Sequence, residues 1–133
     1  MTDEAEIRDL PARWAEAVHV GDLAAVLDAH ADDIVMFDVP PPHQGVRGLQ
    51  AYADTWPGFF TWQAAGARFD VESLDVVAGT DVAFAYGLLR CGTAADFERE
   101  PEQRLRLTVG LRKVAGQWQV THEHHSFADT GGA

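Results

Sequence analysis

Residues 104–127, RLRLTVGLRKVAGQWQVTHEHHSF, decide the fold class. Over residues 105–111 apolar side chains alternate with arginine and threonine, which is typical of a β-strand with one buried face. Ala115-Gly116 predicts a tight turn, and the strand after it runs over residues 118–127. Two long strands joined by a short turn predict an antiparallel hairpin in this part of the chain.

Two further strands are expected directly upstream of this hairpin. Apolar residues alternate over residues 69–76, and the alternation changes phase near Ser73, as a β-bulge would cause. Residues 79–81, Gly-Thr-Asp, predict a hairpin turn into a strand over residues 82–89. The polar residues 94–102 are interpreted as a loop. The second half of the chain therefore reads as an antiparallel meander.

The first half of the chain shows helical spacing. Apolar residues recur every three or four positions up to Val18, and Asp3 with Glu6 is interpreted as a capping pair. Pro11 predicts a kink in this helix. The other expected elements are a helix over residues 23–30, a short strand over residues 34–39 and a helix from residue 49 to about residue 60. Helices first and an antiparallel sheet last predict an α+β fold.

Composition excludes several classes of protein. The chain has 133 residues, which suits one domain over 1–133, and a formal net charge of −11. Such a charge is repelled by phosphate backbones and anionic lipids, so we expect no nucleic-acid and no membrane partner. The single cysteine, Cys91, excludes an internal disulfide framework and a thiolate zinc site. With neither a signal peptide nor a membrane span in the sequence, we expect a cytoplasmic protein.

Two segments resemble a known superfamily. ARWAEAVHVGDLAAVLDAHADDIVMFDVPPP followed by VRGLQAYADTWPGFF, and GLRKVAGQWQVTHEHHSF, are similar to the nuclear transport factor 2-like, or SnoaL-like, superfamily. The resemblance implies a cystatin-like cone, in which three N-terminal helices pack in a strongly curved, mostly antiparallel sheet. It also implies an apolar pocket for a small hydrophobic molecule, no cofactor, and a homodimer formed through the sheet face.

Asp38 is the first candidate catalytic residue. It ends a hydrophobic strand before three prolines, where partial burial would raise the pKa of an aspartate toward that of a useful base. By resemblance to ketosteroid isomerases, ADDIVMFD places Asp38 at their catalytic base. Their oxyanion-hole tyrosine falls on Trp14, and their protonated acid falls on or near Val109, which has no proton to donate. Steroid isomerisation by that mechanism is therefore not expected.

The histidines of the last strand form a second candidate site. If the strand is regular, His122, His124 and Ser126 share the face of the apolar residues Trp118 and Val120 and point into the cone. His122 and His124 would then be acids or bases beside Asp38. They are equally well explained as structural residues, and a metal site would need a third ligand such as Asp38, His30 or His43.

Aromatic residues are candidates for the pocket wall, although such residues often belong only to the core. The expected substrate-binding residues are Trp14, Tyr52, Trp56, Phe60, Tyr86, Ser126 and His43. The sequence thus favours an acid/base enzyme of isomerase, cyclase or hydrolase type, acting on a hydrophobic carbonyl or polyketide-like ligand. The alternatives are a non-catalytic binding or dimerisation module and a metal-dependent enzyme that uses His122 and His124.

Overall fold

The computed structural model describes residues 2–131. These residues form five helices and six strands, and most of the helices precede the four long strands, as the α+β prediction requires. The helices are α1 (Asp3–Val20), α2 (Leu23–Leu27), α3 (Leu49–Asp54), α4 (Trp56–Ala64) and α5 (Ala94–Arg99). The strands are β1 (His30–Phe37), β2 (Val46–Arg47), β3 (Arg68–Ala78), β4 (Val82–Gly92), β5 (Leu105–Val114) and β6 (Gln117–Ser126).

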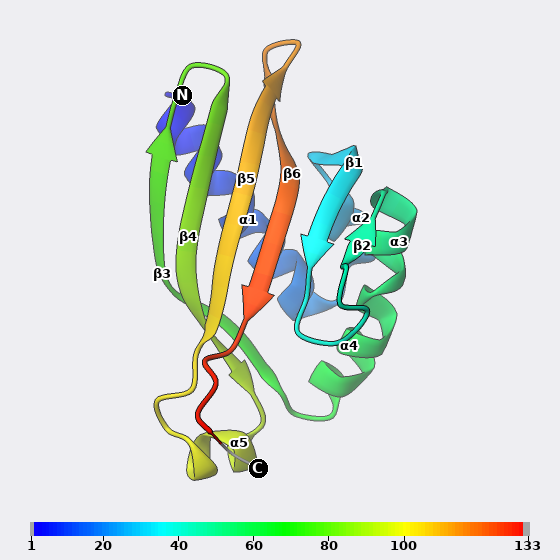
Figure 1. Cartoon of the computed structure of the whole chain (residues 1–133), viewed down its shortest axis with the longest axis vertical. Helices are drawn as coiled ribbons and strands as arrows, with labels where there is room; N and C mark the ends of the chain where they lie inside the picture. The colour runs from blue at the N-terminus through cyan, green and yellow to red at the C-terminus, as the bar shows by residue number, and fades with distance from the viewer. Residues whose placement is uncertain (1, 132–133) are drawn as a thin grey trace.

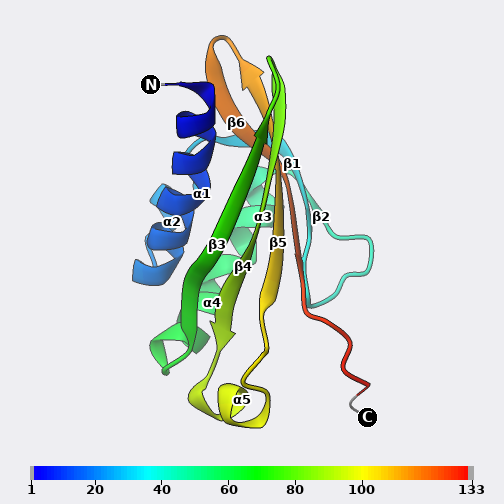
Figure 2. The same ribbon diagram turned by 90° about the vertical axis from the view of Figure 1, so that its left-hand side faces the viewer.

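The six strands form one sheet in the order β2-β1-β6-β5-β4-β3. Only the β1–β6 pair is parallel, and the other neighbours are antiparallel. Figure 1 shows the long strands side by side, and Figure 2 shows α1 to α4 gathered on one face of the curved sheet. We call this covered face the inner face and the opposite one the outer face. The cystatin-like α+β prediction is confirmed.

The core lies between the helices and the inner face. Leu105, Leu107, Val109 and Leu111 of β5 are each at most 4% exposed, as their alternation predicts. They pack with Ile7, Trp14 and Val18 of α1 and with Trp118 and Val120 of β6. Burying a large apolar side chain in this way stabilises the fold by about 1.5–3 kcal/mol.

The helices differ from the sequence-based predictions in several places. Thr2, not Asp3, caps α1 by accepting a hydrogen bond from the amide of Ala5, and the helix continues through Pro11 to Val20. The helix expected over residues 49–60 is two helices, α3 and α4, which meet at Thr55. The expected loop at residues 94–102 contains α5, whose capping box pairs Thr93 with Asp96.

Three register shifts shape the sheet, and one of them lies in the β1–β6 pair between His30 and Val35. The predicted bulge near Ser73 is confirmed, because the β3–β4 register shifts between Val71 and Ser73. The third register shift falls between Gly110 and Leu111, where Leu111 pairs with Val120 but Gly110 pairs with His122. Thr121 is therefore an extra residue in β6. The phase of the strand changes at this point, and the candidate site depends on that change.

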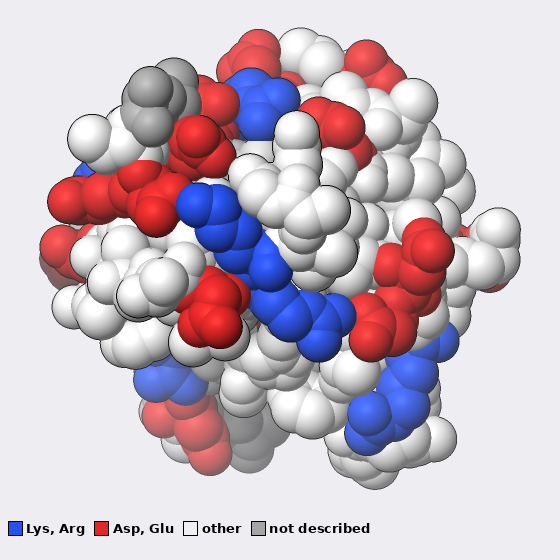
Figure 3. Space-filling model, turned by 90° about the horizontal axis from the view of Figure 1, so that it is seen from above, with Lys and Arg blue, Asp and Glu red and all other residues white. Residues whose placement is uncertain are grey.

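The surface carries charges of both signs. Figure 3, which shows the end of the molecule where the hairpin tips lie, has basic side chains bordered by acidic ones. For example, Lys113 of β5 lies 3.1 Å from a carboxylate oxygen of Asp3 in α1. Within the described part of the chain, no helix is long and apolar enough to cross a membrane.

Candidate functional site

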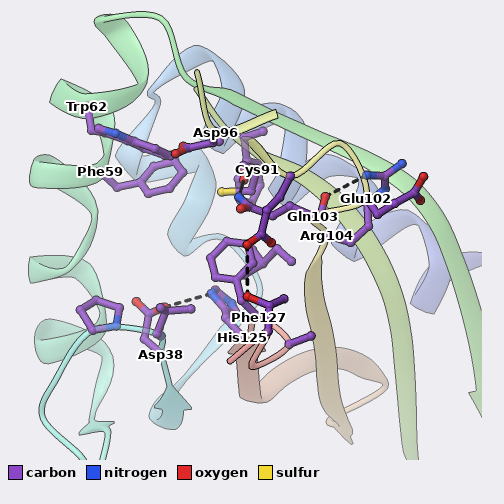
Figure 4. Close-up of a pocket in the computed structure, with 18 of the residues that line it drawn as sticks. Asp38, Phe59, Trp62, Cys91, Asp96, Glu102, Gln103, Arg104, His125 and Phe127 are labelled. Carbon is purple, nitrogen blue, oxygen red and sulfur yellow. Dashed lines mark hydrogen bonds and ion pairs between the residues drawn. The ribbon is translucent and has the colours of Figure 1, made fainter. Parts of the chain in front are cut away.

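A large cavity opens between α4, α5, the end of β1 and the end of β6. Its volume is about 1060 Å³, which is at the upper end for small-molecule sites. Phe59 and Trp62 of α4 form one side, and Gln103 and Arg104 lie across from them (Figure 4). Further apolar wall residues are Trp56, Phe69, Leu105 and Phe127. The wall therefore suits an apolar ligand of several rings.

A carboxylate and an imidazole meet at one end of this cavity. Asp38 Oδ1 lies 3.5 Å from His125 Nδ1, and both residues line the cavity (Figure 4). The same oxygen accepts a hydrogen bond of 2.7 Å from the amide of Val39. Asp38 Oδ2 accepts no hydrogen bond from residues 2–131 in the described structure. One oxygen of Asp38 is thus held by the protein, while the other is left for a ligand.

A fully buried carboxylate lies behind His125. Glu123 is 1% exposed and accepts a hydrogen bond of 3.1 Å from His125 Nε2 on its Oε1. Its Oε2 accepts hydrogen bonds of 2.8 Å from the Tyr52 hydroxyl and from His30 Nε2. Tyr52 in turn accepts a 2.9 Å hydrogen bond from Trp14 Nε1. A chain of polar groups therefore runs from the cavity wall deep into the core.

The charged groups in this hydrogen-bonded series stabilise each other's ionised forms. Burial would lower the pKa of His125, but the carboxylates of Asp38 and Glu123 outweigh it and raise this pKa to about 9. Burial would raise the pKa of Glu123, yet hydrogen bonds from His125 and His30 hold it well below the usual value. His125 is therefore an imidazolium at neutral pH, flanked by two carboxylates.

The pKa of Asp38 is shifted in the direction opposite to the sequence-based expectation. Burial acts to raise this pKa, as expected, but the ion pair with His125 outweighs burial and the pKa is lowered. His30 is affected in the same way as His125: burial opposes its charge, and Glu123 raises its pKa. Burial also raises the pKa of Cys91, on the cavity wall, to about 12, so its thiol stays protonated.

The expected orientation of the last strand is wrong after Val120. Because Thr121 is an extra residue, Glu123 and His125 continue the inner face, and His122 and His124 lie on the outer face. His122 Nδ1 donates to the carbonyl of Val35 at 2.7 Å. His124 is exposed and meets the Phe37 ring edge-on at 5.7 Å.

The predicted substrate-binding residues divide into three groups. Trp56 lines the cavity, with Phe60 stacked against it at 6.0 Å. Trp14 and Tyr52 are buried in the polar chain behind the cavity wall. The remaining three lie away from the cavity lining: Tyr86 is 47% exposed on the outer face, Ser126 accepts a hydrogen bond from Arg106, and His43 is exposed.

The sequence contained one sign of this rearrangement. A glycine inside a strand often marks a bulge, and Gly110 lies in β5 at the register shift, paired with the residue that follows the extra Thr121. Glu123 and His125 were missed as site residues because a regular strand would have turned them outward.

The geometry also bears on the hypothesis of a metal-dependent enzyme. Residues 2–131 contain no cluster of three or more His, Cys, Asp or Glu side chains suited to a metal ion.

With this geometry in place, comparison with known proteins defines the family. Residues 7–130 match the model of the SnoaL-like domain. The chain therefore belongs to the SnoaL-like domain family. No curated protein matches the sequence.

Solved structures place the chain among NTF2-like proteins. An NTF2-like protein of unknown function from Pseudomonas putida KT2440 is 40% identical, with a TM-score of 0.79, over 92% of this chain and 84% of that one. A candidate ketosteroid isomerase from Shewanella frigidimarina NCIMB 400 is 20% identical, with a TM-score of 0.68, over 89% and 92% of the two chains. A candidate dehydratase from Streptomyces avermitilis is 13% identical, with a TM-score of 0.72, over 96% and 97%. The last two show similarity of fold.

Proposed function

We propose that this SnoaL-like protein is a cofactor-independent acid/base enzyme of isomerase, cyclase or hydrolase type. Its ligand would be a hydrophobic, carbonyl-bearing or polyketide-like small molecule. The observation that carries the proposal is the Asp38–His125 ion pair, 3.5 Å long, at the wall of an apolar cavity of about 1060 Å³. Charged groups are costly to hold in such a place, and active sites are where proteins commonly hold them.

Asp38 is the proposed base. Its Oδ2 is free to take a proton from the carbon next to the ligand carbonyl, while Oδ1 stays bound to the Val39 amide. The protonated carboxyl then returns the proton to a second atom of the same ligand. Returning it to another carbon completes an isomerisation. If the carbanion first attacks a second carbonyl of the same ligand, returning the proton to the new alkoxide oxygen completes a cyclisation. Both outcomes balance without any added co-reactant.

His125 is the proposed electrostatic partner of this step. Its positive charge keeps Asp38 ionised before the ligand is attacked. Once Asp38 has taken the proton and lost its charge, His125 Nδ1 favours the negative charge that develops on the ligand oxygen nearby. Glu123 fixes the imidazole ring from the far side through the Nε2 hydrogen bond. The ring therefore needs little reorganisation when the proton moves.

Exchange of α-protons for deuterium tests this proposal without knowledge of the natural substrate. Hydrophobic ketones, beginning with β-tetralone, are incubated with the protein in deuterium oxide, and exchange is followed by NMR. We expect Asp38→Asn to slow the protein-dependent exchange by about 100-fold or more. Asp32→Asn, at an exposed position of β1, is the matched control and should exchange at the wild-type rate. Equal rates for Asp38→Asn and wild type would refute the assignment.

A binding module without catalysis is the second candidate function. The lowered pKa of Asp38 favours this alternative, because a weakly basic carboxylate removes protons from carbon slowly. If ketones bind in the cavity but the wild-type protein accelerates no exchange, the binding function is the better description.

We further propose that the outer face of the sheet pairs with a second copy of the chain. Phe84, Tyr86 and Leu88 alternate along β4 and are 45%, 47% and 38% exposed on this face. In neighbouring strands, Thr108 and His124 lie in the same row as Tyr86. Charged side chains flank this row: Asp75 of β3 pairs with Tyr86, and Arg106 of β5 pairs with Leu88. A second copy can cover the apolar stripe, and the acidic and basic side chains beside the stripe can pair between the two copies.

A further inference from the structure

The charges around the cavity select the kind of ligand that can enter it. Asp38, whose side chain is 29% exposed, lies at one end of the cavity, and the three other acidic residues of the lining are Asp96, Glu100 and Glu102. Glu100 accepts a hydrogen bond of 3.1 Å from the Thr130 hydroxyl, which is also part of the lining. Glu102 has no ion-pair partner among residues 2–131. Carboxylates are therefore present at the Asp38 end of the cavity, in α5 and along the segment that follows α5.

The positive groups of the lining are already bound by the protein. Arg104 is the single arginine or lysine among the described lining residues. Its Nε and Nη2 donate to the two carboxylate oxygens of Glu72, at 2.7 and 3.2 Å. Its Nη1 donates to the backbone carbonyls of Pro101 and Gln103. Each nitrogen of this guanidinium is thus directed at an acceptor other than a cavity ligand.

The second positive group, His125, is likewise held. Nδ1 faces Asp38 at 3.5 Å and Nε2 donates to Glu123 at 3.1 Å, so the imidazolium charge is shared between two carboxylates. Asp96 is also paired, with Arg99 at 2.8 Å. An anionic ligand would therefore meet Glu100 and Glu102, which form no ion pair among residues 2–131, and no unengaged cation of the described lining. Such a ligand would lose its hydration without gaining an ion pair.

We propose that the cavity admits uncharged or cationic hydrophobic ligands and rejects anionic ones, including carboxylates and phosphate-bearing thioesters. This inference rests on the proposed function for its assignment of the cavity as the ligand site. It narrows the hydrophobic carbonyl class to compounds without a negative charge. A ligand delivered on a phosphorylated carrier would have to be released before it enters.

Three probes that share one ring system test the proposal. Pyrenemethanol is uncharged, pyrenecarboxylate is anionic and pyrenemethylammonium is cationic near neutral pH. Their dissociation constants are measured by pyrene fluorescence at low and at high salt. We expect the anion to bind about tenfold or more weakly than the alcohol at low salt, and the difference to shrink as salt screens the carboxylates. The cation should bind at least as tightly as the alcohol.

Charge removal at the cavity provides the matched variants. In the double variant Glu100→Gln and Glu102→Gln, the anion should bind about three- to tenfold more tightly, with the alcohol unchanged. Glu98→Gln, at an exposed position of α5 outside the lining, is the control and should leave all three constants unchanged. Equal binding of anion and alcohol to the wild-type protein overturns the proposal, as does failure of all three probes to bind.

The test separates this inference from the proposed function. Discrimination against the anion together with normal α-proton exchange in Asp38→Asn would refute the catalytic assignment and leave the ligand class standing. Loss of exchange in Asp38→Asn together with equal binding of the three probes would refute the ligand class and leave the catalytic assignment standing.

Discussion

The two faces of β6 present the same residue type in two different settings. His125, on the inner face, is 5% exposed and lies between the carboxylates of Asp38 and Glu123. His124, one residue earlier on the outer face, is exposed and contacts the Phe37 ring. A histidine therefore gains its chemistry from the partners that the fold provides. In this strand the partners are chosen by one extra residue, Thr121.

The largest expected effect of breaking this arrangement comes from Glu123→Gln. The amide removes a buried negative charge that accepts hydrogen bonds from His30, Tyr52 and His125. Breaking a buried, hydrogen-bonded ion pair from one side costs about 3–5 kcal/mol of folding free energy. Chemical denaturation measures this loss. An unfolding free energy within about 1 kcal/mol of the wild type would show that the buried charges do not depend on one another.

On the outer face, the corresponding test is Phe84→Glu. A charge placed on the exposed apolar stripe of β4 would be repelled by its symmetry mate in the proposed dimer, because both copies carry it. We expect the dimer dissociation constant to rise by about 100-fold, since burying an unpaired charge costs several kcal/mol. Analytical ultracentrifugation measures it. A wild-type protein that stays monomeric at all concentrations would rule out the dimer.

Stability should depend on pH through the inner face. The folded pKa of His125 is raised from 6.5 to about 9, so its contribution is complete below 6.5 and is lost as the pH rises through about 9. The pKa of Glu123 is lowered from 4.5, so its contribution is lost as the pH falls below that value. Unfolding measured across this range should show a loss of about 3 kcal/mol on the alkaline side. His125→Gln should remove most of that loss, and an unchanged profile in this variant would contradict the assignment.

The smallest expected effect is that of His124→Ala. Its side chain is exposed, so we expect an unfolding free energy within about 0.5 kcal/mol of the wild type. The α-proton exchange rate should also be unchanged. A large loss of exchange in this variant, with the dimer intact, would show that His124 takes part in the reaction. It would then contradict the contrast drawn between His124 and His125.

Alternation and turn residues were sufficient to predict most of the fold. The hairpin around Ala115 and Gly116, the bulge near Ser73 and the placing of most helices before the four long antiparallel strands are found in the structure. These features depend on local backbone preference and on which face of an element is apolar. The short strand β2 and the helix α5 were not predicted. The break between α3 and α4 at Thr55 was not predicted, since the apolar stripe continues across it.

The candidate site was less predictable because it depends on contacts between distant residues. Asp38 was identified from its position after a hydrophobic strand, and it does line the cavity. The direction of its pKa shift was missed, because that shift comes from His125, which is 87 positions further along the chain. The orientation of His125 depends in turn on how β6 pairs with β5 across Gly110. A pattern read along one strand does not contain that pairing.

The central claim is that His125 is a cation held between Asp38 and Glu123 at the wall of a ligand cavity. Nitrogen NMR of isotopically labelled protein near neutral pH observes the protonation of both imidazole nitrogens directly. We expect both His125 nitrogens to carry protons, and the Nδ1 signal to move when β-tetralone or pyrenemethanol binds. A neutral His125 with one bare nitrogen, or signals that no cavity ligand shifts, would contradict the account.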